Sequence, residues 1–134
     1  MLQLEIVTPD HRAYSDAVDM VVIPAVEGEM GILPLHIPLM TTINPGELAV
    51  VKGGKTDYMA VGGGFVEVTA SSVTVVTDMA VAEERIDEAA VQEAIDRAEA
   101  RLKETNLEGE ELATVEASIQ RSLAQLHVKR RRHS

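Results

Sequence analysis

The sequence predicts an α+β protein, in which an N-terminal antiparallel β-sandwich, or flattened barrel, is followed by a C-terminal antiparallel helical hairpin. The first observation is a series of short β-type runs separated by turn residues, with no helical pattern between them. The second is a change of composition near Val81, because beyond Ile86 proline is absent and Ala, Glu, Gln, Arg and Leu dominate. We therefore expect a β-sandwich domain over residues 1–84 and a helix-turn-helix domain with a basic tail over residues 85–134.

The first predicted strand covers residues 2–8, where apolar and polar residues alternate with period two before the turn signal Pro9-Asp10. The pair Gly53-Gly54 lies between two β-type runs and predicts a tight hairpin. Frequent turns between short strands are typical of a sandwich or barrel. The remaining predicted strands cover residues 18–24, 46–52, 56–61, 65–69 and 73–78.

Residues 28–38 are dense in turn signals, with two glycines, two prolines and His36 among eleven residues. Glycine reaches backbone angles that other residues avoid, and proline fixes φ and lacks an N–H, so we expect a tightly turned crossover between strands. The spacing of Gly28 and Gly31 predicts that Glu29 and Met30 lie at its tip. The segment is very apolar for a loop, so its side chains either fill the core or face a partner.

Two amphipathic helices are predicted beyond the sandwich, joined by residues 106–109. Asp87 is placed to cap the first helix. Burial of about eight apolar side chains stabilises the hairpin by roughly 1.5–3 kcal/mol each. This total does not exceed the conformational entropy cost of ordering about forty residues. Docking onto the sandwich therefore decides whether the hairpin stays attached or extends. The two apolar stripes are Val91, Ile95, Ala98 and Leu102, and then Leu112, Val115, Ile119, Leu123 and Leu126.

The chain is acidic, with a net charge of −10 and a pI near 4.8. Such a charge argues against a surface for nucleic acids, which needs clustered lysine and arginine. Residues 1–82 carry 10 acids and 3 bases, whereas residues 83–134 carry 12 and 9. Four of these bases are consecutive at residues 129–132. On composition alone, this basic tip is either a solubilising tail or a partner-binding surface.

Several classes of site are excluded by what the sequence lacks. Without cysteine there is no disulfide and no thiolate metal site. The N-terminus has no basic region followed by an apolar run, and no window approaches 18 uncharged apolar residues. We therefore expect any membrane association to be made through a partner.

Two glycine-containing motifs have structural interpretations that are stronger than their functional ones. Gly54-Lys55-Thr56 resembles the end of a phosphate-binding loop, but Ala49 stands where that motif needs glycine, and a strand follows in place of a helix. The run Gly62-Gly63-Gly64 indicates a bulge or a close backbone approach more strongly than an anion site.

His36 has no second histidine or cysteine at a ligand-like spacing, so we expect no metal site and favour a structural or interface role. The carboxylates of Asp16, Asp19, Glu27 and Glu29 show no pattern of a nucleophile or a matched acid–base pair. We interpret them as a solvated face and predict no catalytic residue.

Four features together carry a resemblance to a known family. They are the run EGEMGILPLHIP at residues 27–38, Pro45-Gly46 shortly after it, GGFVEV at 63–68 followed by VTV at 73–75, and the Ala- and Glu-rich helical pair. In this order they resemble the epsilon subunit of bacterial F-type ATP synthases, called delta in mitochondrial enzymes. The resemblance covers nearly the whole chain.

The resemblance implies a β-sandwich that clamps the gamma subunit at the foot of the central stalk and contacts the ring of c subunits. It assigns Glu29, Met30, Gly31 and His36 to the interface with the c ring and gamma. It further implies a peripheral protein on the cytoplasmic side of the bacterial plasma membrane, held there by the complex.

The resemblance also implies that the hairpin can fold against the sandwich or extend into the catalytic head of alpha and beta subunits, where it inhibits ATP hydrolysis. The residues expected to contact an acidic segment of beta are Arg121, Lys129, Arg130, Arg131 and Arg132.

Some members of the family bind ATP in the folded hairpin through an Ile/Leu-Asp-x-x-Arg-Ala motif. Here residues 86–91 read IDEAAV, so Ala90 replaces the arginine, while Asp87, Arg97 and Arg121 stand where contacts are expected. Because a charge-assisted bond is lost, we expect ATP binding to be weak or absent, and we predict no other cofactor.

We therefore expect a non-catalytic rotor subunit that couples proton translocation through the c ring to ATP synthesis and restrains ATP hydrolysis. Two other classes stay open: a free-standing β-sandwich adapter whose hairpin binds a partner helix, and a small enzyme that uses His36. Only the rotor hypothesis accounts for the 28–38 segment and the hairpin together.

Overall fold

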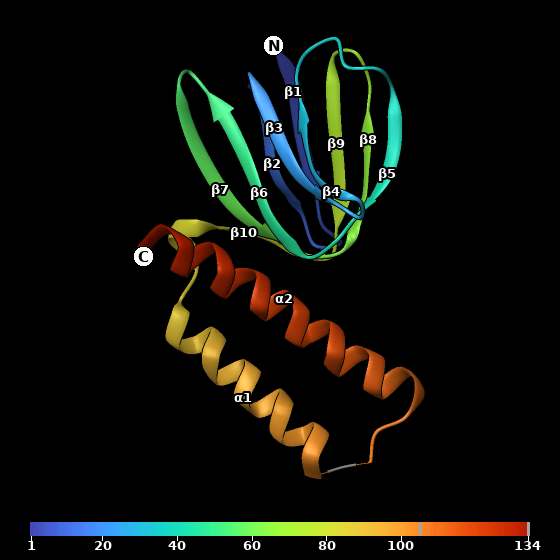
Figure 1. Cartoon of the computed structure of the whole chain (residues 1–134), viewed down its shortest axis with the longest axis vertical. Coiled ribbons are helices and arrows are strands. Elements are labelled where there is room, and N and C mark those ends of the chain that lie inside the picture. Colours follow the sequence, from blue (N-terminus) through green and yellow to red (C-terminus); the bar gives the residue numbers. More distant parts are fainter. Residues whose placement is uncertain (105, 134) are drawn as a thin grey trace.

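A computed structural model describes residues 1–104 and 106–133, with side chains described at residues 1–103 and 106–130. A single sheet of ten strands curls into a nearly closed barrel, and two helices follow it (Figure 1). This confirms the predicted α+β class. The strands are β1 (Leu2–Val7), β2 (Arg12–Val18), β3 (Met20–Ala25), β4 (Gly28–Ile32), β5 (Leu39–Ile43), β6 (Gly46–Lys52), β7 (Lys55–Val61), β8 (Gly64–Val68), β9 (Ser72–Thr77) and β10 (Ala80–Ala82).

The strand order is β10-β7-β6-β3-β5-β8-β9-β1-β2, and β4 pairs with β3 outside this path. All pairs are antiparallel except β1 with β9, which is parallel, with Gln3 opposite Ser72 and Val7 opposite Val76. The sandwich is thus closed by a contact between the first strand and a strand about seventy residues later in the sequence.

Alternation places one face of most strands in the sandwich core. In β1, Leu2, Leu4 and Ile6 are fully buried, as their period-two pattern predicts. The predicted Gly53-Gly54 hairpin joins β6 to β7, and both glycines have positive φ (+59° and +79°). The other fully or largely buried core residues are Val18, Val21, Ile23, Ile32, Ile43, Leu48, Val50, Met59, Val61, Val66, Val68, Val73 and Val75.

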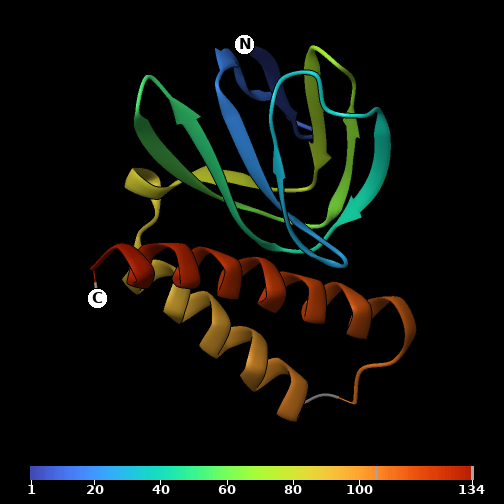
Figure 2. The same ribbon diagram turned by 45° about the horizontal axis from the view of Figure 1, so that its top comes forward.

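A 3₁₀ turn, η1 (Glu83–Arg85), leads from the sandwich to the helices α1 (Glu88–Glu104) and α2 (Gly109–His133). The Asp87 side chain caps α1, accepting a hydrogen bond from the Ala90 N–H at 3.1 Å. Helix α2 lies between the sandwich and α1, and it contacts β6 and β7 (Figures 1 and 2). The hairpin is therefore docked through α2.

The hairpin packs through a second apolar cluster, separate from the sandwich core. Ile86, Val91 and Ile95 meet Leu126 and Val128 of α2 in this cluster. It is completed from the sandwich side by Ala60, with Tyr58, Met79 and Val81 packed against it. The apolar stripe predicted for the second helix is only partly right. Its Leu123 is 44% exposed, whereas Val128, which this stripe omits, is fully buried.

Candidate functional site

The segment between β4 and β5, residues 33–38, forms an apolar loop at the end of the sandwich remote from the helices (Figure 1). We call it the distal loop. Leu33, Leu35 and Ile37 are 57%, 84% and 79% exposed, and Met40 just beyond it is 63% exposed. Of the two predicted arrangements for the apolar side chains of this segment, the core-filling one is therefore wrong for these four residues. Clustered exposed apolar side chains are typical of a surface that meets a partner.

Backbone bonds hold the distal loop in one conformation. The Leu35 N–H donates to the Ala70 carbonyl at 2.8 Å, and the His36 N–H donates to the Leu33 carbonyl at 3.2 Å. His36 Nδ1 lies 2.7 Å from the Ile37 carbonyl oxygen, so its ring braces the loop locally. Leu35 has φ +68°, a left-handed conformation that is strained for a branched apolar residue.

The expectation that Glu29 and Met30 lie at the tip of a loop is wrong, because these residues and Gly31 lie in a strand. They belong to β4, where Met30 is opposite Ile23 of β3, and its side chain packs against the sandwich core. Glu29 lies near the helix-facing end of β4 and lines a cavity of about 370 Å³ with His127 of α2. The structure thus separates Glu29 from His36, which lies in the distal loop at the opposite end (Figure 1).

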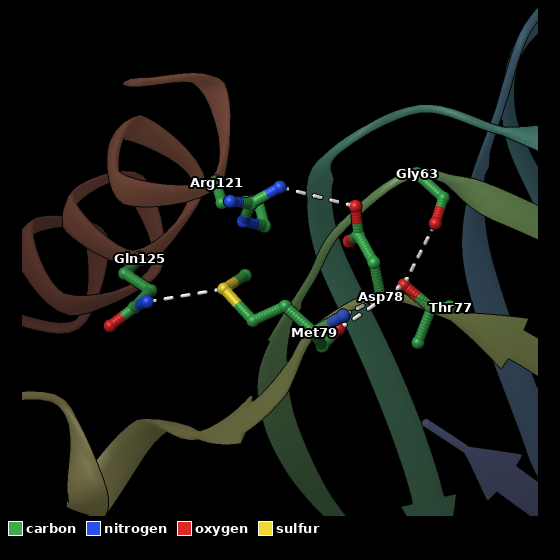
Figure 3. Close-up of polar contacts among 6 residues, drawn as sticks. All are labelled: Gly63, Thr77, Asp78, Met79, Arg121 and Gln125. Atoms are coloured by element: carbon green, nitrogen blue, oxygen red, sulfur yellow. Dashed lines mark hydrogen bonds and ion pairs between the residues drawn. The ribbon is translucent and has the colours of Figure 1, made fainter. Parts of the chain in front are cut away.

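A second feature is a tight crossing of backbones, formed by Gly62, Gly63, Gly64 and residues 77–79, which we call the glycine corner. The Gly62 N–H donates to the Met79 carbonyl at 2.9 Å, and the buried Thr77 hydroxyl lies 3.1 Å from the Gly63 carbonyl oxygen (Figure 3). A Cβ at Gly62 would overlap the Asp78 carboxylate, and one at Gly64 would overlap the Val76 carbonyl. The glycine run is therefore a close backbone approach, as predicted.

The glycine corner presents Asp78 and Met79 to helix α2. Arg121 Nη1 lies 3.3 Å from Asp78 Oδ2, and Gln125 Nε2 lies 3.1 Å from Met79 Sδ (Figure 3). One turn further along α2, Lys129 Nζ donates to the Glu83 carbonyl at 3.4 Å. These polar contacts line the apolar cluster under α2 and fix the register of the hairpin on the sandwich.

Arg130 contacts α1 rather than the sandwich. Its Nε lies 2.6 Å from Glu88 Oε1, and its Nη2 donates to Gln92 Oε1 at 3.2 Å. The two helices are thus tied together near the open end of the hairpin. The side chains of Arg131 and Arg132, which were predicted to contact a partner, lie outside the described residues.

The three residues predicted to contact a nucleotide do not converge in this conformation. Asp87 caps α1, and Arg97 lies ten residues further along the same helix, a rise of about 15 Å. Arg97 pairs loosely with Glu93 at 3.9 Å, whereas Arg121 faces Asp78. Each therefore has a protein partner.

The solvated-face interpretation is too simple for Asp16 of β2 and for Asp19, which lies between β2 and β3, because both bond to the β6–β7 hairpin. Lys52 Nζ lies 2.5 Å from Asp16 Oδ2, and the Gly53 N–H donates to Asp19 Oδ2 at 2.8 Å. The hydrogen bond from Lys52 lowers the pKa of the Asp16 carboxyl below its ordinary 3.8, and the same bond raises the pKa of Lys52. Burial raises the pKa of the neighbouring Tyr14.

Among the residues that the structure describes, no group of three or more His, Cys, Asp or Glu side chains could hold a metal ion. No helix in the same part of the chain is long and apolar enough to cross a membrane.

Distal loop, glycine corner and hairpin define a β-sandwich protein whose C-terminal helices are docked on one end of the sandwich. Two family models match consecutive parts of it: the β-sandwich domain of the ATP synthase delta/epsilon chain over residues 1–83, and the long α-helix domain over residues 84–130. The chain belongs to the ATP synthase delta/epsilon family. This confirms the resemblance inferred from the motifs.

Individual relatives agree over nearly the full length. The chain is 44% identical to the ATP synthase epsilon chain of Dehalococcoides mccartyi strain BAV1, covering 98% of this chain and 96% of the relative. It is 41% identical to that of Herpetosiphon aurantiacus, covering 99% and 97%.

Solved structures show the same fold. A chain of the Euglena gracilis mitochondrial ATP synthase, in a structure of OSCP, F1 and the c-ring, superposes with a TM-score of 0.72 at 28% identity, covering 89% of this chain and 75% of that one. A chain of the Tetrahymena thermophila enzyme, from a structure of the central stalk and c-ring, superposes with a TM-score of 0.58 at 17% identity, covering 97% and 95%.

Proposed function

We propose that the chain is a non-catalytic rotor subunit of an F-type ATP synthase, in which the sandwich contacts the gamma subunit and the c ring and the hairpin restrains ATP hydrolysis. Membership of the delta/epsilon family supports this, as does the fold shared with chains solved in assemblies that contain the c-ring. In this role the chain transmits proton-driven rotation of the ring toward the catalytic alpha and beta subunits. It is held peripherally at the cytoplasmic face of the bacterial plasma membrane by the complex.

The observation that carries the proposal is the distal loop. Its three exposed apolar side chains stand on a loop that is anchored by one backbone hydrogen bond to Ala70 and one within the loop, at the end of the sandwich remote from the docked hairpin (Figure 1). A preorganised apolar surface binds a partner with little loss of conformational entropy. We assign this loop, with His36, to the contact with the c ring, while the remaining sandwich surface is available to gamma.

Glu29, Met30 and Gly31 take a different place in the proposal from the one that the sequence indicates. Met30 is half-buried in β4, and Glu29 faces the cavity against α2. Glu29 is exposed while the hairpin is docked, and it lies at the end of the sandwich opposite the distal loop. We propose that Glu29 belongs to the gamma side of the interface, and the distal loop to the c-ring side.

The inhibitory role is assigned to α2 and its basic side chains. Arg121, Lys129 and Arg130 lie on this one helix, and together with the residues that follow they give an acidic chain a cationic end. A cationic helix fits an acidic segment of a catalytic beta subunit, because complementary charges fix register and partner choice.

Cross-linking tests the assignment of the distal loop, and the absence of native cysteine makes single-cysteine variants clean. In assembled complexes, Leu35→Cys should cross-link to a c-subunit loop. Glu99→Cys, on the exposed face of α1, is the matched control and should not. Glu29→Cys, at the opposite end of the sandwich, should cross-link to gamma and not to the c ring. If Leu35→Cys fails with several linker lengths while a sandwich cysteine still cross-links to gamma, the loop does not face the ring.

A further inference from the structure

We infer that the sandwich carries its own acidic receptor for Arg121, so that docking of the hairpin and binding of an acidic partner segment compete for the same cations of α2. The inference rests on the proposed inhibitory role of α2. It identifies the residues that bind these cations while the hairpin is docked. It also predicts that substitutions of Asp78 and of Arg121 change ATP hydrolysis in opposite directions.

The receptor is built by the glycine corner. Asp78 follows the last residue of β9, and its carboxylate lies over Gly62, in the space that any side chain at position 62 would occupy. From this position Asp78 Oδ2 meets Arg121 Nη1 at 3.3 Å across the gap to α2 (Figure 3). The bare backbone of Gly62 therefore decides where the carboxylate can lie.

Each cationic side chain of α2 that the structure describes has an acceptor elsewhere in the chain. Arg121 meets Asp78 of the corner, Lys129 meets the Glu83 carbonyl of η1, and Arg130 meets Glu88 of α1. In the docked hairpin these three cations of α2 are therefore already engaged. Detachment of the intact hairpin would free Arg121 and Lys129, whereas Arg130 would become free only when the two helices separate.

The expected size of the competition is modest. The Arg121 and Asp78 side chains are 32% and 48% exposed, and ion pairs with this exposure are weak. Loss of the pair should therefore change the balance between docking and partner binding by about two- to fivefold. The apolar cluster under α2 keeps most of the docking energy.

Three variants separate the receptor from other effects. Asp78→Asn removes the acceptor charge and leaves Arg121 free. Gly62→Ala keeps every charge but displaces the Asp78 carboxylate, and φ at Gly62 is not in the left-handed region that favours glycine. Arg121→Gln removes the shared cation. Asp16→Asn is the matched control, because it removes one negative charge and one salt bridge at the β6–β7 end of the sandwich.

The first measurement uses the full isolated chain and a poly-glutamate peptide, with poly-glutamine as the uncharged control. Peptide affinity is measured by titration, and docking by energy transfer between labels at Lys55→Cys and Ala113→Cys. Asp78→Asn and Gly62→Ala should each bind poly-glutamate about two- to fivefold more tightly than the parent chain, with more undocking on titration. Adding Arg121→Gln should abolish this gain, which is the non-additivity expected of residues in contact.

The proposed competition is refuted if Asp16→Asn raises the affinity for poly-glutamate as much as Asp78→Asn does, because the change in net charge alone would then explain the gain. It is also wrong if neither Asp78→Asn nor Gly62→Ala changes affinity or docking.

In assembled ATP synthase, Asp78→Asn should lower ATP hydrolysis and Arg121→Gln should raise it. If deletion of the hairpin activates hydrolysis but these two variants have no effect, the receptor is refuted and the inhibitory role stands. If the peptide results hold but deletion changes nothing, the inhibitory role is refuted instead.

Discussion

Replacement of Leu35 by glycine should separate the binding role of the distal loop from its folding. Leu35 has φ +68°, and a left-handed backbone costs a non-glycine residue roughly 1–2 kcal/mol. Glycine removes this strain but loses more backbone entropy on folding, by roughly 0.5–1 kcal/mol. The side chain is 84% exposed, so little buried area is lost. Leu35→Gly should therefore leave the free energy of unfolding nearly unchanged or raise it by up to about 1.5 kcal/mol.

The effect on binding should be much larger. If a partner buries the Leu35 side chain fully, its loss costs roughly 1.5–3 kcal/mol of binding free energy. This corresponds to an affinity about ten- to a hundredfold weaker. Leu35→Ala keeps the strained backbone and should bind nearly as weakly as Leu35→Gly, without the gain in stability.

Thermal unfolding of the isolated chain and its reconstitution into ATP synthase depleted of this subunit provide the two measurements. We expect the Tm of Leu35→Gly within about 4 °C of the parent value, or above it, together with clearly weaker reconstitution. A large fall in Tm would show that Leu35 stabilises the fold. Unchanged affinity would show that no partner covers the distal loop.

Three further predictions concern the hairpin, its ligand and the sandwich. Removal of residues 129–134 should raise ATP hydrolysis by the assembled enzyme, and removal of everything from Ile86 should raise it further. Both truncated chains should still assemble. Unchanged hydrolysis with both truncations would mean that the hairpin has only a structural role. Calorimetry should detect little or no ATP binding by the isolated chain, and Ala90→Arg should strengthen it by restoring a charge-assisted bond, whereas micromolar binding by the parent chain would refute this. The pKa of Asp16 is lowered by Lys52, so this pair stabilises the fold above the ordinary pKa of 3.8, and the contribution is lost as pH falls through the lower folded-state pKa. The Tm difference between the parent and Asp16→Asn should accordingly be present at neutral pH and vanish in acid, and a difference that persists in acid would contradict the assignment.

Local patterns were sufficient for most of the architecture. The alternation at residues 2–8, the Gly53-Gly54 hairpin and the cap at Asp87 each depend on neighbours in the sequence, and the structure contains all three. The family was likewise evident from its motifs. Turn signals were less reliable, because Gly28 and Gly31 fall within β4, where pairing with β3 overrides their preference for turns.

The parts of the site that could not be predicted depend on contacts between distant segments. The pairing of Asp78 with Arg121 needs the approach of the glycine corner to α2, and nothing near either residue in the sequence indicates the other. Leu35, whose backbone is left-handed, donates a hydrogen bond to Ala70, at the distant turn between β8 and β9. The exposure of Leu123 and the burial of Val128 depend on which side of α2 meets the sandwich.

The parallel pairing of β1 with β9 has a consequence for synthesis of the chain on the ribosome. β1 is made first, yet its partner on one side, Ser72–Thr77, is made about seventy residues later. Until then β1 can pair only with β2, and the opposite edge of β1 keeps open backbone groups. Contacts between such distant segments also slow folding. The sandwich can therefore close only after β9 has emerged, and a nascent chain that stops earlier would expose a strand edge to its neighbours.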